Sequence, residues 1–396
     1  MQIEILNLLW LLLPVAAASG WMAARHSAAK AGVRGKPRIG ADYVKGLNFL
    51  LDEQPDRAIE VFIKMLDVNS DTVETHLALG SLFRRRGEVD RAIRVHQNLI
   101  ARPALSAQQR DHALLELAQD YMRAGLLDRA EGLFRELIDK DAHVVPALQD
   151  LLKIYQQEKD WRRAAETAVR LNAYSDTPMD RVIAHFYCEL AQEAFEERDY
   201  SDVSKMLKRA LKYDTNCVRA SIMQGDLAKL QGDLKLATRA YRRVERQDVE
   251  YLPEILTPMR ACYEALDNPG EMIAFLREVM ASYKGVSVTL VLADLILEYE
   301  GEEQAAHFVE DQLKEHPSVR GLERLVELNL SHGEIRTQSN LMNLRNLVRP
   351  LLKQLIKNIP VYKCSNCGFS GKVLHWHCPS CKNWNTVKPI HGVEGE

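Results

Sequence analysis

Small residues recur along this chain of 396 residues at a nearly constant spacing, and no other feature limits its fold as strongly. The successive spacings are 34, 38, 34, 39, 34, 35 and 34 residues. A repeat of this length holds one pair of antiparallel helices, in which a small side chain lets the two backbones approach closely. Because one pair cannot bury its apolar face alone, we expect neighbouring pairs to stack. The recurring positions are Ala58, Ala92, Ala130, Ala164, Val203, Ala237, Met272 and Ala306.

Other positions keep the same phase, strongly in the first six repeats and more weakly in the last two. Four residues after the small residue stand Phe62, His96, Phe134, Ala168, Leu207, Tyr241, Leu276 and Glu310, and twelve before it stand Gly46, Gly80, Ala118, Leu152, Ala191, Gly225, Arg260 and Asp294. Turns at Gly87, Gly125 and Gly232 separate the helices. A period of 34 residues is that of the tetratricopeptide repeat. The sequence therefore predicts an all-α superhelix over residues 41–358, with about nine helix pairs and a long concave surface.

The concave surface is the part of such an array that binds peptides or helical partners. Counting along the repeat register assigns five polar residues of the first helices to this groove as candidate partner-binding residues: Arg84, Gln119, Lys153, Gln156 and Arg219. The alternative for each of them is an ordinary solvated side chain.

Four cysteines near the C-terminus have the spacing of a metal site. They are arranged as two C-x-x-C pairs separated by ten residues: Cys364, Cys367, Cys378 and Cys381. Four thiolates form the tetrahedral shell that suits one zinc or one iron ion, and two disulfides are the alternative. His375 and His377 stand close by, either as replacement ligands or as surface or supporting residues.

The segment 359–396 is too short to fold on a hydrophobic core alone, so we expect metal binding to drive its folding. Tyr362, Phe369, Trp376 and Trp384 are predicted to form its small core or its docking face, and a platform for stacking nucleic-acid bases is the alternative. Because the link to the last helix is short, we expect the metal domain to dock on the last helices.

The opposite end of the chain predicts a membrane anchor within residues 1–24. Residues 5–24 carry no charge and, as a helix, would span about 30 Å, the thickness of the hydrocarbon core of a bilayer. Basic residues follow this span in a linker over residues 25–40, which predicts a periplasmic N-terminus, a cytoplasmic body and contact with anionic inner-membrane lipids. A cleaved signal peptide is the alternative, but its positive charges would precede the apolar run.

No sequence signature of catalysis is present, neither a phosphate-binding loop, a dinucleotide-binding glycine motif, an H-E-x-x-H motif nor a nucleophile elbow. We therefore expect a protein that is not an enzyme. The net charge of −3 gives no electrostatic basis for binding nucleic acid. The other three cysteines, Cys188, Cys217 and Cys262, lie in apolar helical stretches and are interpreted as small buried residues rather than a disulfide framework.

The order of these features resembles the lipopolysaccharide assembly protein B family of Gram-negative bacteria over essentially the whole chain. In that family the terminal metal domain is described as rubredoxin-like, which the Cys364-x-x-Cys367-Gly368 and Cys378-Pro379-x-Cys381 motifs fit, although the spacer here is shorter than in rubredoxin. The resemblance implies an inner-membrane regulator that helps the protease FtsH degrade the deacetylase LpxC. It also implies restraint by the inner-membrane protein PbgA, also called YejM.

Two other classes of function remain open. An iron-loaded metal domain would suit electron transfer or redox sensing, although the short spacer argues against electron transfer. The cysteine motifs also resemble the zinc motif of the RadA repair ATPase, which leaves a nucleic-acid-binding zinc ribbon as a second alternative.

Overall fold

The computed structural model describes residues 73–103, 105–174, 178–331 and 359–396, together with a few isolated positions elsewhere. The predicted anchor, the basic linker and the first repeat lie outside the described residues, apart from those isolated positions. Across the described ranges, no helix combines the length and apolar character needed to cross a bilayer. The chain divides into two compact units, Met1–His143 and Val144–Glu396.

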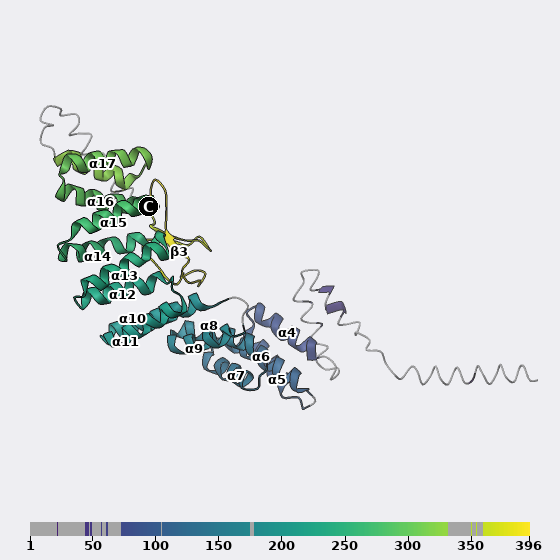
Figure 1. Ribbon diagram of the computed structural model, residues 1–396. Coiled ribbons are helices and arrows are strands. Elements are labelled where there is room, and N and C mark those ends of the chain that lie inside the picture. Colours follow the sequence, from purple (N-terminus) through teal and green to yellow (C-terminus); the bar gives the residue numbers. More distant parts are fainter. Residues whose placement is uncertain are drawn as a thin grey trace, which may run out of the picture. The chain divides into compact units, whose positions relative to one another are not determined.

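The described part of the first unit contains two helix pairs, and that of the second contains five pairs followed by one more helix (Figure 1). In the first unit the helices are α4 (Val73–Arg85), α5 (Val89–Ile100), α6 (Ala107–Arg123) and α7 (Leu127–Asp139). In the second they are α8 (Val144–Glu158), α9 (Trp161–Asn172), α10 (Asp180–Glu196), α11 (Tyr200–Tyr213), α12 (Val218–Leu230), α13 (Leu234–Gln247), the short 3₁₀ helix η1 (Val249–Tyr251), α14 (Leu252–Ala265), α15 (Pro269–Met280), α16 (Val286–Tyr299), α17 (Glu302–Glu315) and α18 (Val319–Ser331). Within the described ranges the tetratricopeptide pairing predicted from the period is confirmed, and the predicted helices after Ser331 lie outside the described residues apart from isolated positions.

The repeat positions twelve before and four after the small residue explain how the two helices of a pair pack. A large side chain at one of these positions faces a small residue at the other. A Cβ atom on Gly80 would lie 2.3 Å from the ring of His96, and one on Gly225 would lie 2.4 Å from the ring of Tyr241. In the pair α8 and α9 the sizes are reversed, because Leu152 stands at the position of Gly80 and Ala168 at the position of His96. The two positions therefore share one volume within the core.

The turns inside the pairs follow one backbone pattern, in which the residue after the first helix is left-handed. Gly87, Gly125 and Gly232 have φ between 77° and 82°, as expected for glycine at a helix C-terminus. The α8, α10 and α14 turns place Lys159, Arg198 and Asp267 in the same region of φ without glycine. An aspartate then caps several of the second helices, as when Asp233 accepts from the backbone N–H of Leu236 over 3.0 Å.

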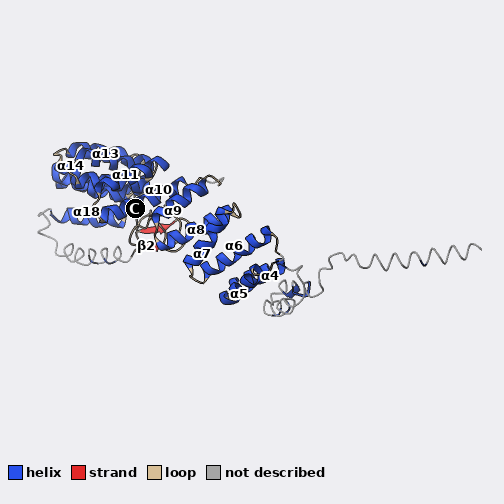
Figure 2. Ribbon diagram, turned by 90° about the horizontal axis from the view of Figure 1, so that it is seen from below, coloured by secondary structure: helices blue, strands red, loops and turns tan. Residues whose placement is uncertain are grey.

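The C-terminal segment forms a small three-stranded antiparallel sheet in the order β2-β1-β3. Its strands are drawn in red in Figure 2. Its strands are β1 (Tyr362–Cys364), β2 (Ser370–Gly371) and β3 (Val387–Pro389). The fold is therefore mostly helical rather than purely helical, because the metal domain adds strands. This domain lies alongside the helix stack of the second unit in Figure 1.

The docking position extends further than the sequence predicted. The tail does reach α16 and α18, where the backbone N–H of Val319 donates to the carbonyl of Val393 over 2.8 Å. However, Trp384 reaches back to α8 and donates its indole N–H to Gln156 over 3.2 Å. The predicted docking on the last helices is confirmed for the tail, but the prediction did not include the contact with α8, because a short link constrains only where the domain begins and not how far its aromatic residues reach.

Candidate metal centre and partner-binding groove

The four predicted cysteines meet at one point of the metal domain. All four Sγ atoms lie within 4.8 Å of one another, with 3.8 Å between Cys364 and Cys381 and 3.7 Å between Cys367 and Cys378. A regular tetrahedron with metal–sulfur bonds of about 2.3 Å has edges of about 3.8 Å. The sulfur positions therefore fit one tetrahedral metal ion, and zinc and iron suit this donor set equally.

Two matching turns bring the sulfurs together. After the first pair, Gly368 has φ of 78° and its N–H donates to the carbonyl of Cys364 over 3.0 Å. After the second pair, Lys382 has φ of 58° and its N–H donates to the carbonyl of Cys378, also over 3.0 Å. A residue with left-handed backbone thus closes each C-x-x-C pair. Both thiols of the pair then point toward the same site.

The surroundings of Cys364 and Cys381 favour the thiolate form of these two ligands. Burial opposes ionisation of Cys364, but hydrogen bonding with the Thr386 hydroxyl and with nearby backbone N–H groups outweighs it and lowers the pKa to about 6. A hydrogen bond from Asn366 lowers the pKa of Cys381. Burial raises the pKa of Cys378 to about 11.

The two nearby histidines are placed outside the sulfur cluster. The His377 Nε2 atom lies 2.9 Å from the carbonyl oxygen of Lys382, and its ring stacks on Trp384 at 4.4 Å. The His375 ring packs edge-on against Phe369 at 5.9 Å. The interpretation of both histidines as surface or supporting residues agrees with this placement.

The tryptophans of the metal domain face the helices. The Trp376 ring stacks on Tyr251 of η1 at 5.0 Å, and the Trp384 ring stacks on His185 of α10 at 5.2 Å. Trp384 also meets the edges of Trp161 and Phe186. The predicted docking face is confirmed for the two tryptophans, which are occupied by protein contacts rather than presented as a platform for bases.

Polar contacts fix the rest of the domain to the same surface. The Tyr251 hydroxyl donates to the carbonyl of Val387 over 3.1 Å, and Tyr362 donates its hydroxyl to Glu254 of α14. The Lys388 ammonium pairs with Glu250 and lies 3.0 Å from a carboxylate oxygen of Asp248. Burial would lower the pKa of Lys388, but Glu250 and Asp248 together raise it.

One large cavity is lined jointly by helices and by the metal domain. It has a volume of about 1080 Å³. Its helical wall includes Lys153 and Gln156 of α8 with the acidic face of α10, and its other wall includes Lys382 and Trp384. Crowding of carboxylates adds to burial in raising the pKa of Glu193 on this wall. The cavity is a composite surface, which neither the helices nor the metal domain forms alone.

Three of the predicted groove residues belong to this unit. Lys153 is an exposed residue of the cavity wall that pairs with Asp150 over 2.7 Å, whereas Gln156 bonds Trp384. Arg219 is buried and pairs with Glu189 over 2.6 Å, joining α12 to α10. Gln156 therefore serves the contact with the chain's own metal domain, and Arg219 holds two first helices together.

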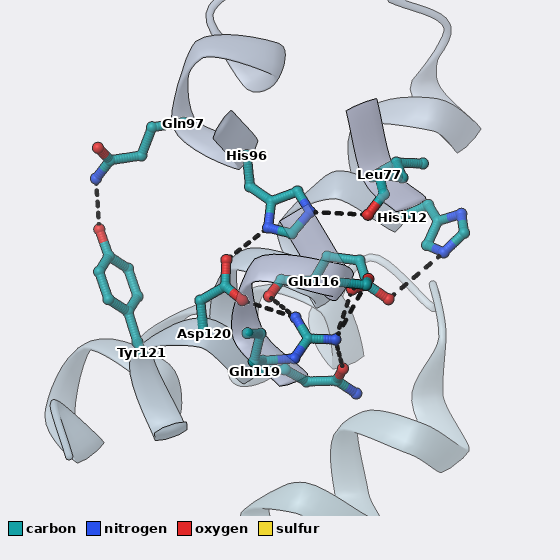
Figure 3. A network of polar contacts seen from close by, with 10 residues as sticks. Leu77, His96, Gln97, His112, Glu116, Gln119, Asp120 and Tyr121 are labelled. Atoms are coloured by element: carbon teal, nitrogen blue, oxygen red, sulfur yellow. Dashed lines mark hydrogen bonds and ion pairs between the residues drawn. The ribbon is translucent and has the colours of Figure 1, made fainter. Parts of the chain in front are cut away.

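The other two predicted groove residues lie in the first unit, within a polar network (Figure 3). Arg84 donates to Asp120 and to Glu116 over 2.7 Å each, and to Gln119 over 3.1 Å. Figure 3 also shows the fully buried ring of His96, whose Nδ1 lies 2.5 Å from Asp120. Burial alone would lower the pKa of Arg84, but its carboxylate partners raise it. Arg84 and Gln119 thus connect first helices of consecutive pairs.

The sequence analysis missed the α10 side of the cavity, namely Glu189, Gln192, Glu193 and Glu196. Gln192 stands eleven residues before its repeat position, as Gln119 and Lys153 do, so the register could have found it. The docking residues His185, Phe186 and Tyr251 gave no such signal, because apolar and aromatic residues at helical spacing are usual in any repeat core.

Comparisons with known proteins agree with both parts of this architecture. The family model described as the rubredoxin metal binding domain matches residues 362–389, and two tetratricopeptide repeat models match residues 75–109 and 188–248. A solved tetratricopeptide repeat-containing protein from Cytophaga hutchinsonii aligns at a TM-score of 0.36 and 12% identity over 67% of this chain and 98% of its own. That match is too distant to add to the assignment.

Curated relatives match from end to end. Lipopolysaccharide assembly protein B of Escherichia coli K12 is 41% identical over 98% of this chain and 100% of its own length. The protein of the same name from Haemophilus influenzae is 36% identical over 98% of this chain and 99% of its own. Since this identity extends over both the repeats and the four-cysteine domain, the chain belongs to the lipopolysaccharide assembly protein B family.

Proposed function

We propose that this chain is an adaptor that regulates lipopolysaccharide biosynthesis at the inner membrane, where it presents the deacetylase LpxC to the protease FtsH. The name shared by its full-length relatives supports a role in lipopolysaccharide assembly. The tetratricopeptide repeats support a role in binding other proteins. The two named partners come from the family resemblance.

The observation that carries the proposal is the composite cavity of about 1080 Å³ beside the docked metal domain. A client bound there touches the α8 and α10 helices and the metal domain together. Because the metal domain folds only around its ion, the client surface depends on the metal although the metal takes no part in a reaction. A shell of four thiolates leaves no open position for an activated water, which favours binding over catalysis.

The predicted anchor over residues 5–24 gives the adaptor its location. With the basic linker on the cytoplasmic side, the body lies next to the membrane-bound protease, and this raises the effective concentration of a bound client. PbgA would restrain the complex from within the same membrane. Protease added to sealed inner-membrane vesicles whose cytoplasmic face points inward is expected to spare the large C-terminal body.

The half-life of LpxC in growing cells tests this function. Cells that carry the chain without residues 1–24 are expected to degrade LpxC more slowly than cells that carry the full chain, although the body still folds. Charge reversal in the cavity by Lys153→Glu with Glu193→Lys is expected to slow degradation, whereas Lys208→Glu, at an exposed position of the second helix α11, leaves it unchanged. An unchanged LpxC half-life in both the anchorless and the cavity variants would refute the proposal.

A further inference from the structure

Two cysteines outside the metal site lie against each other inside the helical stack. Cys188 is in the third turn of α10, and Cys217 is the residue that caps the N-terminus of α12. Their Sγ atoms are 3.8 Å apart, although 29 positions separate them in the chain. Cys188 is fully buried and Cys217 is 3% exposed. They therefore form a thiol pair from two adjacent repeats, which no ligand role in the metal site explains.

The two thiols have different surroundings. The hydrogen bond between the two thiols lowers the pKa of Cys217, which also stands at the N-terminus of α12, where the helix dipole favours negative charge. Burial raises the pKa of Cys188 well above its ordinary value. The Arg219 guanidinium adds positive charge near both sulfurs. This asymmetry suits an attacking thiolate beside a second thiol that completes a disulfide.

The more acidic thiol is also the one nearer to solvent. Cys217 directly follows an exposed turn that contains Thr215 and Asn216. Because Cys217 is 3% exposed, its oxidation requires this turn to open to a small oxidant. Cys262 of α14 is a third buried cysteine, but burial raises its pKa and no thiol is recorded beside it among the described residues. It serves as an internal reference for a buried thiol without a partner.

We propose that Cys188 and Cys217 are a reversible oxidation site that forms a disulfide with hydrogen peroxide. The Cys217 thiolate attacks one oxygen of the peroxide, which gives a sulfenic acid and releases hydroxide. The Cys188 sulfur then attacks the sulfenic sulfur, its proton leaves with the departing hydroxyl as water, and the disulfide forms. Two thiols and one peroxide thus become one disulfide and two waters, and a dithiol reductant reverses the change.

The product requires only a local movement. A disulfide bond is about 2.05 Å long, so the sulfurs must approach by roughly 1.7 Å, within reach of small rotations of the two side chains. The bond would join α10 to α12, the helices already linked by Arg219 and Glu189. This inference stands independently of the proposed adaptor function.

Mass spectrometry of the metal-loaded full chain after exposure to hydrogen peroxide tests the site. Free thiols are alkylated before digestion, and metal release is followed in the same sample. We expect a linked peptide pair containing Cys188 and Cys217 that appears before metal is lost and disappears on reduction, while Cys262 remains a free thiol. Linkage confined to the metal-binding cysteines, or oxidation of Cys262 as fast as Cys217, would overturn the proposal.

Single substitutions separate the role of Cys217 as the attacking thiolate from the role of Cys188 as the second thiol. In Cys188→Ser the sulfenic acid on Cys217 has no partner thiol, so dimedone is expected to label Cys217 about tenfold faster than Cys262. In Cys217→Ser, Cys188 is expected to stay unlabelled. Labelling of Cys188 in the second variant, or none at Cys217 in the first, would contradict the assigned roles, and the linked peptide in the unaltered chain provides a readout even if a variant is unstable.

Discussion

Trp384 of the metal domain donates its indole N–H to Gln156 of α8 over 3.2 Å, although 228 positions separate the two residues. Around this bond the indole packs on His185, Phe186 and Trp161. The contact ties the metal-binding domain to the first helices of the second unit, whereas the tail of the same domain reaches α18. It explains why the metal could control a surface formed largely by helices.

Removing the Trp384 ring is expected to loosen this docking. Trp384→Ala should lower the free energy of unfolding of the metal-loaded protein by about 3 kcal/mol, from the lost apolar area and ring packing. Trp384→Phe keeps a ring and loses the N–H, so its effect should be about 1 kcal/mol. Denaturant titration measures both, with Val373→Ala at a 65% exposed position as a control that stays within about 0.5 kcal/mol. Equal stability of Trp384→Ala and the control would show that the docked contact contributes nothing.

Loss of two ligands is expected to unfold the metal domain and spare the repeats. Cys364→Ser with Cys367→Ser leaves two thiolates, too few to hold the ion that organises this small domain. Elemental analysis should find no bound metal, while circular dichroism retains the helical signal. Cys262→Ser, which changes a buried cysteine outside the sulfur cluster, should keep the metal. A folded, docked domain in the metal-free double variant would contradict this prediction.

Two glycines of the first unit should respond to alanine with opposite signs. Gly125 has φ of 77° in a turn, so Gly125→Ala should destabilise by about 1 kcal/mol through backbone strain. Gly132 lies inside α7 with right-handed backbone, so Gly132→Ala should stabilise by up to about 1 kcal/mol through helix propensity. A Cβ atom meets nothing within 4 Å at either site, so packing does not confuse the comparison. Thermal unfolding measures the pair, and shifts of the same sign would be inconsistent with the turn assignment.

His185 is expected to make the protein less stable in mild acid. Burial, with the nearby charges of Arg219 and His377, lowers its pKa to about 3 from an ordinary 6.5. Because the unfolded state binds the proton more readily, the stabilising effect of neutral His185 is complete above pH 6.5 and is lost as the pH falls toward 3. The loss should approach about 1.4 kcal/mol per pH unit below pH 6.

The variant His185→Gln should flatten this dependence. Unfolding free energies at pH 7 and pH 5.5 would be compared for the unaltered chain, for His185→Gln and for His316→Gln at an exposed position. The metal site is the same in all three proteins, so its own acid sensitivity cancels. If the unaltered chain and His185→Gln lose equal stability on acidification, His185 is not held neutral by burial.

The sequence was sufficient for the repeats and the metal ligands because both depend on local patterns. The 34-residue period reports small residues such as Ala92 and Ala237, and both are fully buried between paired helices. The C-x-x-C spacing likewise identifies the four metal-ligating cysteines, because a single turn brings together the two sulfurs of each pair. Neither result required knowledge of distant contacts.

Contacts between segments that lie far apart in the sequence could not be predicted from such local patterns. Nothing in the sequence near Trp384 identifies Gln156 as its partner, because that choice depends on how far the metal domain extends across the second unit. The proximity of Cys188 to Cys217 depends in the same way on the stacking of two repeats. Turns such as the one at Arg198 were also less visible, since this left-handed position carries no glycine.

Degradation of purified LpxC by FtsH in lipid vesicles tests the central claim most directly. We expect the metal-loaded full chain to accelerate degradation, and the same chain with Cys364→Ser and Cys367→Ser not to do so, although its repeats and residues 1–24 are unchanged. Acceleration by the metal-free variant equal to that by the metal-loaded chain would contradict the claim that a metal-held domain and the repeat helices together form the adaptor surface.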